Sequence, residues 1–103
     1  YESIRVALAA DDLAAAKSAA GAIKEDQNAE ALAGAGSLPS ARESFKQLSK
    51  RAVKVATDHD GLFLAHCPMV KGGGGDWVQA SPKVGNPYFG KSMLTCGSIR
   101  PAK

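Results

Sequence analysis

Five side chains with soft donor atoms occupy two short segments of this 103-residue chain. The segment "LAHCPM" holds His66, Cys67 and Met69 within four positions. The segment "SMLTCG" adds Met93 and Cys96, so each of the two methionines stands two or three residues from one of the two cysteines. Thiolate and thioether sulfur favour Cu(I) over hard ions such as Mg²⁺ or Ca²⁺. This pairing of donors therefore suggests a soft-metal site.

The same cysteines could instead form a disulfide. Two cysteines in one small domain are typical of a bridge, and closing the loop from Cys67 to Cys96 would contribute about 3–4 kcal/mol in the chain-entropy model. A bridge explains both cysteines but gives Met69, Met93 and His66 no role, whereas a metal site uses all five. The residues alone leave both interpretations open.

Other chemistries find less support. A zinc site built from Cys67, Cys96, His66 and His59 would lack finger spacing and any paired C-x-x-C. The C-x-x-C-H of a c-type haem is absent, and the order of histidines and cysteines does not suit a blue-copper centre. A nucleophilic Cys67 assisted by His66 conflicts with the opposite directions of neighbouring strand side chains. We therefore expect no enzymatic activity.

Length and charge narrow the class of protein. The chain suits a single domain, residues 1–103. Residues 1–60 carry 8 Lys and Arg against 9 Asp and Glu, whereas residues 61–103 carry 5 against 1. The basic residues of the second part are scattered, which argues against nucleic-acid binding. Its single carboxylate, Asp76, argues against a Ca²⁺ or Mg²⁺ site there.

No stretch of the sequence has the length of a membrane span, so we expect no direct membrane insertion. The chain opens on Tyr1 without a methionine. We expect a processed product or an excised piece, with any signal segment outside this chain.

Apolar spacing predicts helices in the first 60 residues. From Ile4 to Ile23 the pattern is helical, and Asp11 or Asp12 can cap a helix that begins near Leu13. One bent helix or two short helices fit equally well. The segment "NAEALAGAGSLP" is typical of a weak helical turn that leads into a connector.

A further helix is expected from about Ala41 to Thr57. Ser40 and Glu43 form a capping box ahead of an apolar stripe that includes Phe45. The helix should end at "DHDG", where the glycine acts as terminator.

The pattern then changes to strands. "LFLAHC" and "DWVQAS" predict two strands joined by the flexible "KGGGG". Because strand side chains alternate, His66 and Cys67 should point apart unless the strand ends at Pro68. "NPYFGKSMLTCG" predicts a final helix, with Asn86 as its cap and Met93 and Cys96 about one turn apart on one face.

These elements predict a mainly α fold. We expect a small bundle of three to four helices, a short C-terminal β-hairpin and a final short helix. The helical part covers about 1–60, and the hairpin and helix that carry the cysteines and methionines cover about 61–99. Packing of the last helix beside the end of the first strand would bring Met93 and Cys96 to Cys67 and Met69.

The motifs "HCPM", "DWVQ", "NPYFG" and "SMLTCG", in this order, resemble a small periplasmic domain. That domain is attached to membrane-fusion (adaptor) subunits of heavy-metal efflux pumps and also occurs as a free-standing secreted protein. The resemblance covers nearly the whole chain and is most specific over residues 62–99. The matching positions are Cys67, Pro68, Met69, Trp77, Asn86, Pro87, Tyr88, Gly90, Met93, Cys96 and Gly97.

The resemblance implies a periplasmic location and a role in copper or silver resistance. With the soft donors, it predicts capture and hand-off of Cu(I) or Ag(I) by Cys67, Met69, Met93 and Cys96, together with His66. The expected partners are efflux-pump components or a periplasmic copper carrier. The alternative is a docking domain of an efflux adaptor that binds no metal and is locked by a Cys67–Cys96 disulfide.

Overall fold

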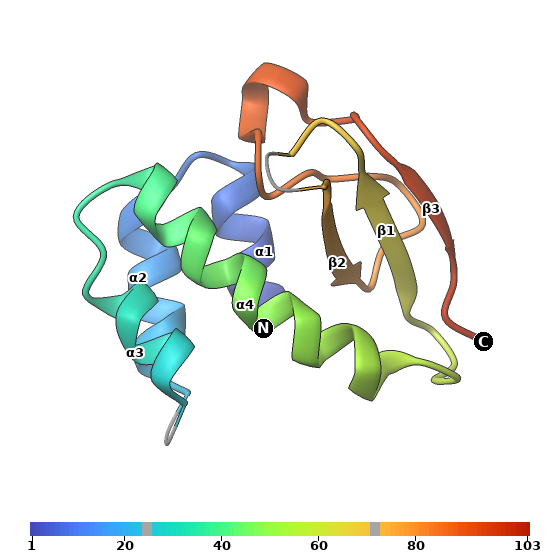
Figure 1. Ribbon diagram of the computed structural model, residues 1–103, viewed down its shortest axis with the longest axis horizontal. Helices are drawn as coiled ribbons and strands as arrows, with labels where there is room; N and C mark the ends of the chain where they lie inside the picture. The colour runs from blue at the N-terminus through green and yellow to red at the C-terminus, as the bar shows by residue number, and fades with distance from the viewer. Residues whose placement is uncertain (24–25, 71–72) are drawn as a thin grey trace.

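The computed structural model describes residues 1–23, 26–70 and 73–103. The helices are α1 (Glu2–Ala9), α2 (Leu13–Gly21), α3 (Gln27–Ala33), α4 (Leu38–Ala56) and the 3₁₀ helix η1 (Gly90–Met93). The strands are β1 (Phe63–Cys67), β2 (Gly75–Gln79) and β3 (Ser98–Pro101). Helices α1 to α3 gather on one side, and α4 runs from them to the sheet, contacting both α3 and β2 (Figure 1). None of the helices in the described ranges is long and apolar enough to span a bilayer.

Side-chain caps mark where α2, α3 and α4 begin. The Asp12 carboxylate accepts the Ala15 N–H at 3.0 Å, so the first segment forms two short helices. Ser37 caps α4, and the expected start at Ser40 is wrong by one helical turn. The reason is Pro39, which lies in the first turn of the helix, where its missing N–H costs no hydrogen bond.

The sheet contradicts the predicted fold class. Its three antiparallel strands have the order β2-β1-β3, so the chain does not end in a hairpin followed by a helix. The third strand, β3, pairs Ile99 with Ala65 on β1. Four α-helices and a three-stranded sheet make a mixed α/β fold. The predicted glycine connector falls partly on residues 71 and 72, which lie outside the described residues.

The predicted final α-helix is wrong for a local reason. Asn86 does cap a turn, because its Oδ1 accepts the N–H groups of Tyr88 and Phe89. The turn does not continue, because Gly90 has a left-handed φ of +57°. A single 3₁₀ turn, η1, follows instead, so Met93 and Cys96 do not share the face of an α-helix.

Four aromatic rings connect the helices to the sheet. Tyr1 stacks on Phe45 with ring centroids 4.9 Å apart, and Phe45 meets the edge of Tyr88 at 5.7 Å. Tyr88 in turn meets Trp77 of β2 at 5.9 Å. Trp77 and Phe45 have no exposed surface. Because aromatic side chains bury the most area per residue, this row compensates for a core otherwise rich in alanine.

Arg42 joins three distant segments of the chain. Its Nη2 donates to the Leu8 carbonyl at 2.9 Å and to the Asp11 carboxylate at 2.6 Å, and its Nε donates to the Pro87 carbonyl at 2.8 Å. The Lys91 N–H donates to the other oxygen of Asp11 at 3.0 Å. These contacts lower the pKa of Asp11, chiefly through the Lys91 N–H and the guanidinium. The network holds the segment between β2 and β3 against the first helices.

Gly90→Ala is expected to destabilise the domain. A left-handed φ alone costs a non-glycine residue about 1–2 kcal/mol, and a Cβ at Gly90 would overlap the carboxylate of Asp11. We expect the free energy of unfolding, measured by chemical denaturation, to fall by at least about 2 kcal/mol. Gly21→Ala is the control, because a Cβ there has no neighbour within 4 Å. Equal losses in the two variants would contradict this interpretation.

Alkaline pH should destabilise the domain through Tyr1. Burial raises the pKa of its phenol to about 12. The stability that the protonated phenol contributes is therefore complete below pH 10 and is lost as the pH rises through 12. Tyr1→Phe keeps the ring but cannot ionise, so its free energy of unfolding should fall less than that of the wild type between pH 9 and 12. Denaturation curves with the same pH slope for both proteins would contradict the assignment.

Candidate functional site

The structure brings two of the five predicted donors together. The sulfur atoms of Cys67 and Cys96 lie 3.1 Å apart, although 29 positions separate the residues in the chain. Cys67 has no exposed surface, whereas Cys96 is half-buried. Both cysteines are free thiols. The pair therefore has one member in the core and one at the surface.

The alternation of side chains along β1 determines which residues lie on the same sheet face as Cys67. Ala65, Cys67 and the cross-strand residue Trp77 belong to the main core cluster. Leu64 and Val78, on the other face, belong to a second cluster with the end of α4. His66 also lies on this second face, so its side chain points away from the neighbouring thiol.

His66 is paired with Asp76 on the neighbouring strand. The two residues are directly opposite in the register of β1 and β2, and Nδ1 lies 2.5 Å from Oδ1. The side chains are 47% and 58% exposed. The structure therefore places His66 in an exposed polar pair on the opposite sheet face from the cysteines.

Both methionines have exposed surface, in contrast to Cys67. Met69 is 62% exposed and lines a hollow of about 290 Å³ with Glu43, Lys46 and Phe89, and neither cysteine lines that hollow. Met93, the last residue of η1, is 38% exposed. The thioethers therefore lie at the surface, and the close donor pair consists of thiols alone.

Gly97 allows the backbone of Cys96 to approach β1. Its φ is +138°, and a Cβ there would come within 2.9 Å of the His66 carbonyl oxygen and 3.2 Å of the Trp77 ring. A side chain at this position would therefore displace the cysteine segment. Gly97 is the last residue of "NPYFGKSMLTCG", the segment predicted as a final helix, and in the structure its role is this close approach.

Asn86 fixes Cys96 from the other side. The Nδ2 of this buried residue donates to the Cys96 carbonyl at 2.8 Å. Sequence reasoning had recognised Asn86 only as a cap. The hydrogen bond to Cys96 spans ten positions, and the local pattern around "NP" contains no indication of it.

The hydrogen bond between the two thiols sets the electrostatics of the pair. This contact, with some burial, raises the pKa of Cys96. The more accessible thiol is therefore protonated at neutral pH, which makes it a slow nucleophile. When a soft ion binds to the pair, or an oxidant converts it to a disulfide, the Cys96 thiol must lose its proton.

Within the described ranges, no group of three or more His, Cys, Asp and Glu side chains could hold a metal ion. A zinc set with His59 is not assembled among the described residues, and His59 lines a hollow that neither cysteine lines. Among the predicted donors in the described part of the chain, Cys67 and Cys96 are the two that the structure places within 3.1 Å of each other.

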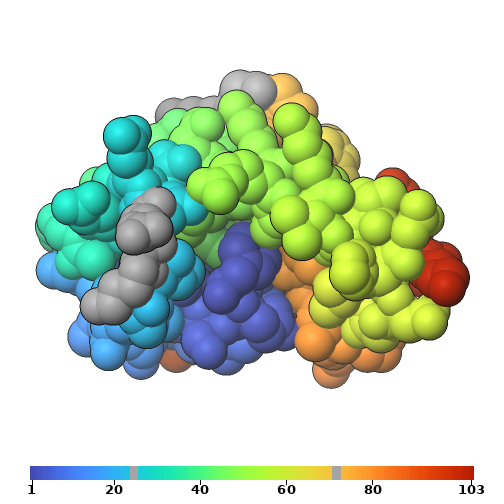
Figure 2. Space-filling view, turned by 90° about the horizontal axis from the view of Figure 1, so that it is seen from below, coloured from blue at the N-terminus to red at the C-terminus, as the bar shows by residue number. Residues whose placement is uncertain are grey.

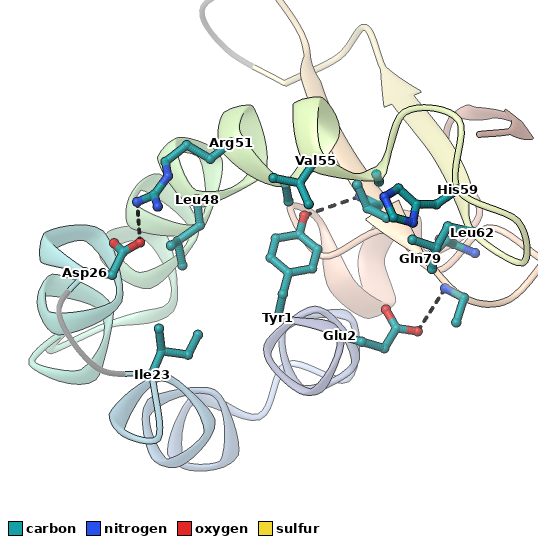
Figure 3. Close-up of a pocket in the computed structure, with 14 residues that line it drawn as sticks. Tyr1, Glu2, Ile23, Asp26, Leu48, Arg51, Val55, His59, Leu62 and Gln79 are labelled. Carbon is teal, nitrogen blue, oxygen red and sulfur yellow. Dashed lines mark hydrogen bonds and ion pairs between the residues drawn. The ribbon is translucent and has the colours of Figure 1, made fainter. Parts of the chain in front are cut away.

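That other hollow is apolar and has a volume of about 450 Å³. Leu48 and Val55 of α4 face Tyr1 across it, and the Arg51–Asp26 ion pair borders it (Figure 3). Figure 2 shows this face of the molecule, with the start of α1 in dark blue between α4 in green and the residues after β2 in orange. None of the five predicted donors lines this hollow.

The chain matches no protein-family model, no curated protein and no solved structure. The resemblance to an efflux-adaptor domain therefore stays a prediction.

Proposed function

We propose that this domain captures one monovalent soft ion, Cu(I) or Ag(I), between Cys67 and Cys96 and hands it to a partner protein. The observation that carries the proposal is the 3.1 Å distance between their sulfur atoms. Thiolates are the protein ligands that Cu(I) prefers. In keeping with the resemblance, we place this role in the periplasm, in copper or silver resistance. The partner is an efflux-pump component or a copper carrier.

A modest movement of the thiols would admit the ion. With metal–sulfur bonds of about 2.3 Å, two sulfurs on one ion lie about 3.8 Å apart in tetrahedral and about 4.6 Å apart in linear geometry. The sulfurs, now 3.1 Å apart, must therefore separate by roughly 0.7 to 1.5 Å. Rotation of the half-buried Cys96 side chain supplies such a movement, while Cys67 stays fixed in the core.

Hand-off follows from the unequal burial of the pair. Cys96 is the thiol that a partner ligand can reach, and Cys67 is shielded. A partner thiolate would replace Cys96 first and Cys67 second, so the ion is never without a soft ligand. Only metal–sulfur bonds are exchanged, so the role is transport without catalysis.

Removing either thiol should abolish tight binding. We expect Cys67→Ser and Cys96→Ser to weaken Cu(I) affinity at least 100-fold, because each variant leaves a single thiolate. Anaerobic titration of the reduced domain against a colorimetric Cu(I) chelator measures this.

The apparent Cu(I) affinity of the wild-type domain should also rise with pH, because binding displaces the proton of Cys96, whose pKa is raised.

Three further variants define the ligand set. Met69→Leu and His66→Ala should leave Cu(I) affinity unchanged, because Met69 is largely exposed in a separate hollow and His66 lies on the other sheet face. Met93→Leu tests whether Met93 is a third ligand. It should leave Cu(I) affinity unchanged if the ion is bound by the two thiolates alone, and lower it if Met93 also coordinates the ion. Wild-type affinity in both serine variants would refute the proposal.

The same short distance favours a second candidate function, a docking domain locked by a Cys67–Cys96 disulfide. The bridge would tie the end of β1 to the segment before β3. It would stabilise the domain by about 3–4 kcal/mol.

Isolation from an oxidising compartment tests this second function. If the bridge is the native state, the intact mass will be about two hydrogens below the reduced value, and the protein will take up no Cu(I) until a reductant is added. A native protein with two free thiols that binds Cu(I) directly would exclude it.

A further inference from the structure

The segment from Asn86 to Cys96 closes on itself at one buried residue. Asn86 has no exposed surface. Its N–H donates to the Leu94 carbonyl at 2.8 Å, and its Nδ2 donates to the Cys96 carbonyl at 2.8 Å. Its Oδ1 accepts the N–H groups of Tyr88 and Phe89 at 2.8 and 3.1 Å. One side chain therefore holds both ends of this loop.

Packing does little to hold the residues that lead to Cys96. Residues 91–95 are all exposed, and the single turn of η1 ends at Met93. What fixes Cys96 is its own N–H bond to the Met93 carbonyl at 3.0 Å, the Asn86 amide and the tight contact at Gly97. Of the two hydrogen bonds, the one from the Asn86 amide joins Cys96 to a fully buried side chain.

We propose that Asn86 is a positioning residue for the dithiol: its amide N–H holds the Cys96 backbone so that the Cys96 thiol meets Cys67. As far as metal capture is concerned, this inference rests on the proposed function. The positioning itself concerns only the two thiols, so it can be measured without any metal. Asn86 contacts no ion and acts through Cys96.

Asn86→Asp isolates the relevant hydrogen bond. Aspartate has the same shape and keeps an oxygen for the N–H groups of Tyr88 and Phe89, so the turn retains its cap. The carboxylate cannot donate to the Cys96 carbonyl and repels it instead. Gln79→Glu is the matched control, because it makes the same amide-to-acid change at a buried residue whose side chain makes no hydrogen bond to Cys96.

The first measurement is the thiol–disulfide equilibrium with glutathione. Two protein thiols and one glutathione disulfide give one protein disulfide and two glutathione thiols, so protons and electrons balance. The equilibrium constant reports how well the thiols are held together. We expect Asn86→Asp to lower it at least tenfold and Gln79→Glu to leave it within twofold, although both variants lose unfolding free energy. The second measurement is Cu(I) affinity, which should fall at least tenfold for Asn86→Asp alone.

The outcomes separate the two proposals. A wild-type protein that forms the disulfide but binds no Cu(I) would refute the proposed function and leave the positioning role standing. A folded Asn86→Asp variant with the wild-type equilibrium constant would overturn the positioning role. If that variant does not fold, Asn86→Ser replaces it, because the serine hydroxyl can cap the turn but is too short to reach Cys96. The same tenfold loss is expected, and an unchanged constant would again overturn the role.

Discussion

The contact of Arg42 with three carbonyl and carboxylate groups is the interaction on which the arrangement of the molecule depends. The Arg42 guanidinium on α4 donates hydrogen bonds to Leu8 at the end of α1, to Asp11 in the turn between α1 and α2, and to Pro87 in the loop after β2. The planar fork of arginine suits this, because its donors are fixed in direction. The residue next to Pro87 is Asn86, which holds Cys96. The cysteine pair is thereby anchored to the helical part of the fold.

The sequence carries much of the local structure but little of the connections between segments. Asp12 caps a helix as its pattern predicts, and "LFLAHC" forms a strand whose alternation separates His66 from Cys67. The proline at 39 was mistaken for part of a connector, although proline is equally at home in the first helical turn. Whether Gly90 ends a helix or sits within one depends on its left-handed φ and on the Asp11 carboxylate, which lies 79 positions away in the chain and occupies the space that a Cβ would need.

In the candidate site, too, the sequence predicts the local elements better than the contacts between distant segments. The meeting of Cys67 and Cys96 agrees with the expectation that the two segments converge, but the route differs, because a 3₁₀ turn and a hydrogen-bonded loop replace the expected α-helix. The predicted helical face that paired Met93 with Cys96 is therefore not formed. The third strand was missed because "SIRP" is only four residues long and ends in proline, a residue uncommon in strands.

That proline has a consequence for the whole molecule. Ala102 donates its N–H to the Leu62 carbonyl, so the neighbouring Pro101 directs its backbone away from β1 toward the open side of β3. Proline has no hydrogen to offer an incoming chain, and the exposed Arg100 beside it adds charge. Exposed edge strands can pair with strands of other molecules and so lead to aggregation. Pro101 and Arg100 therefore make this edge of the sheet a poor template for a strand from a second copy.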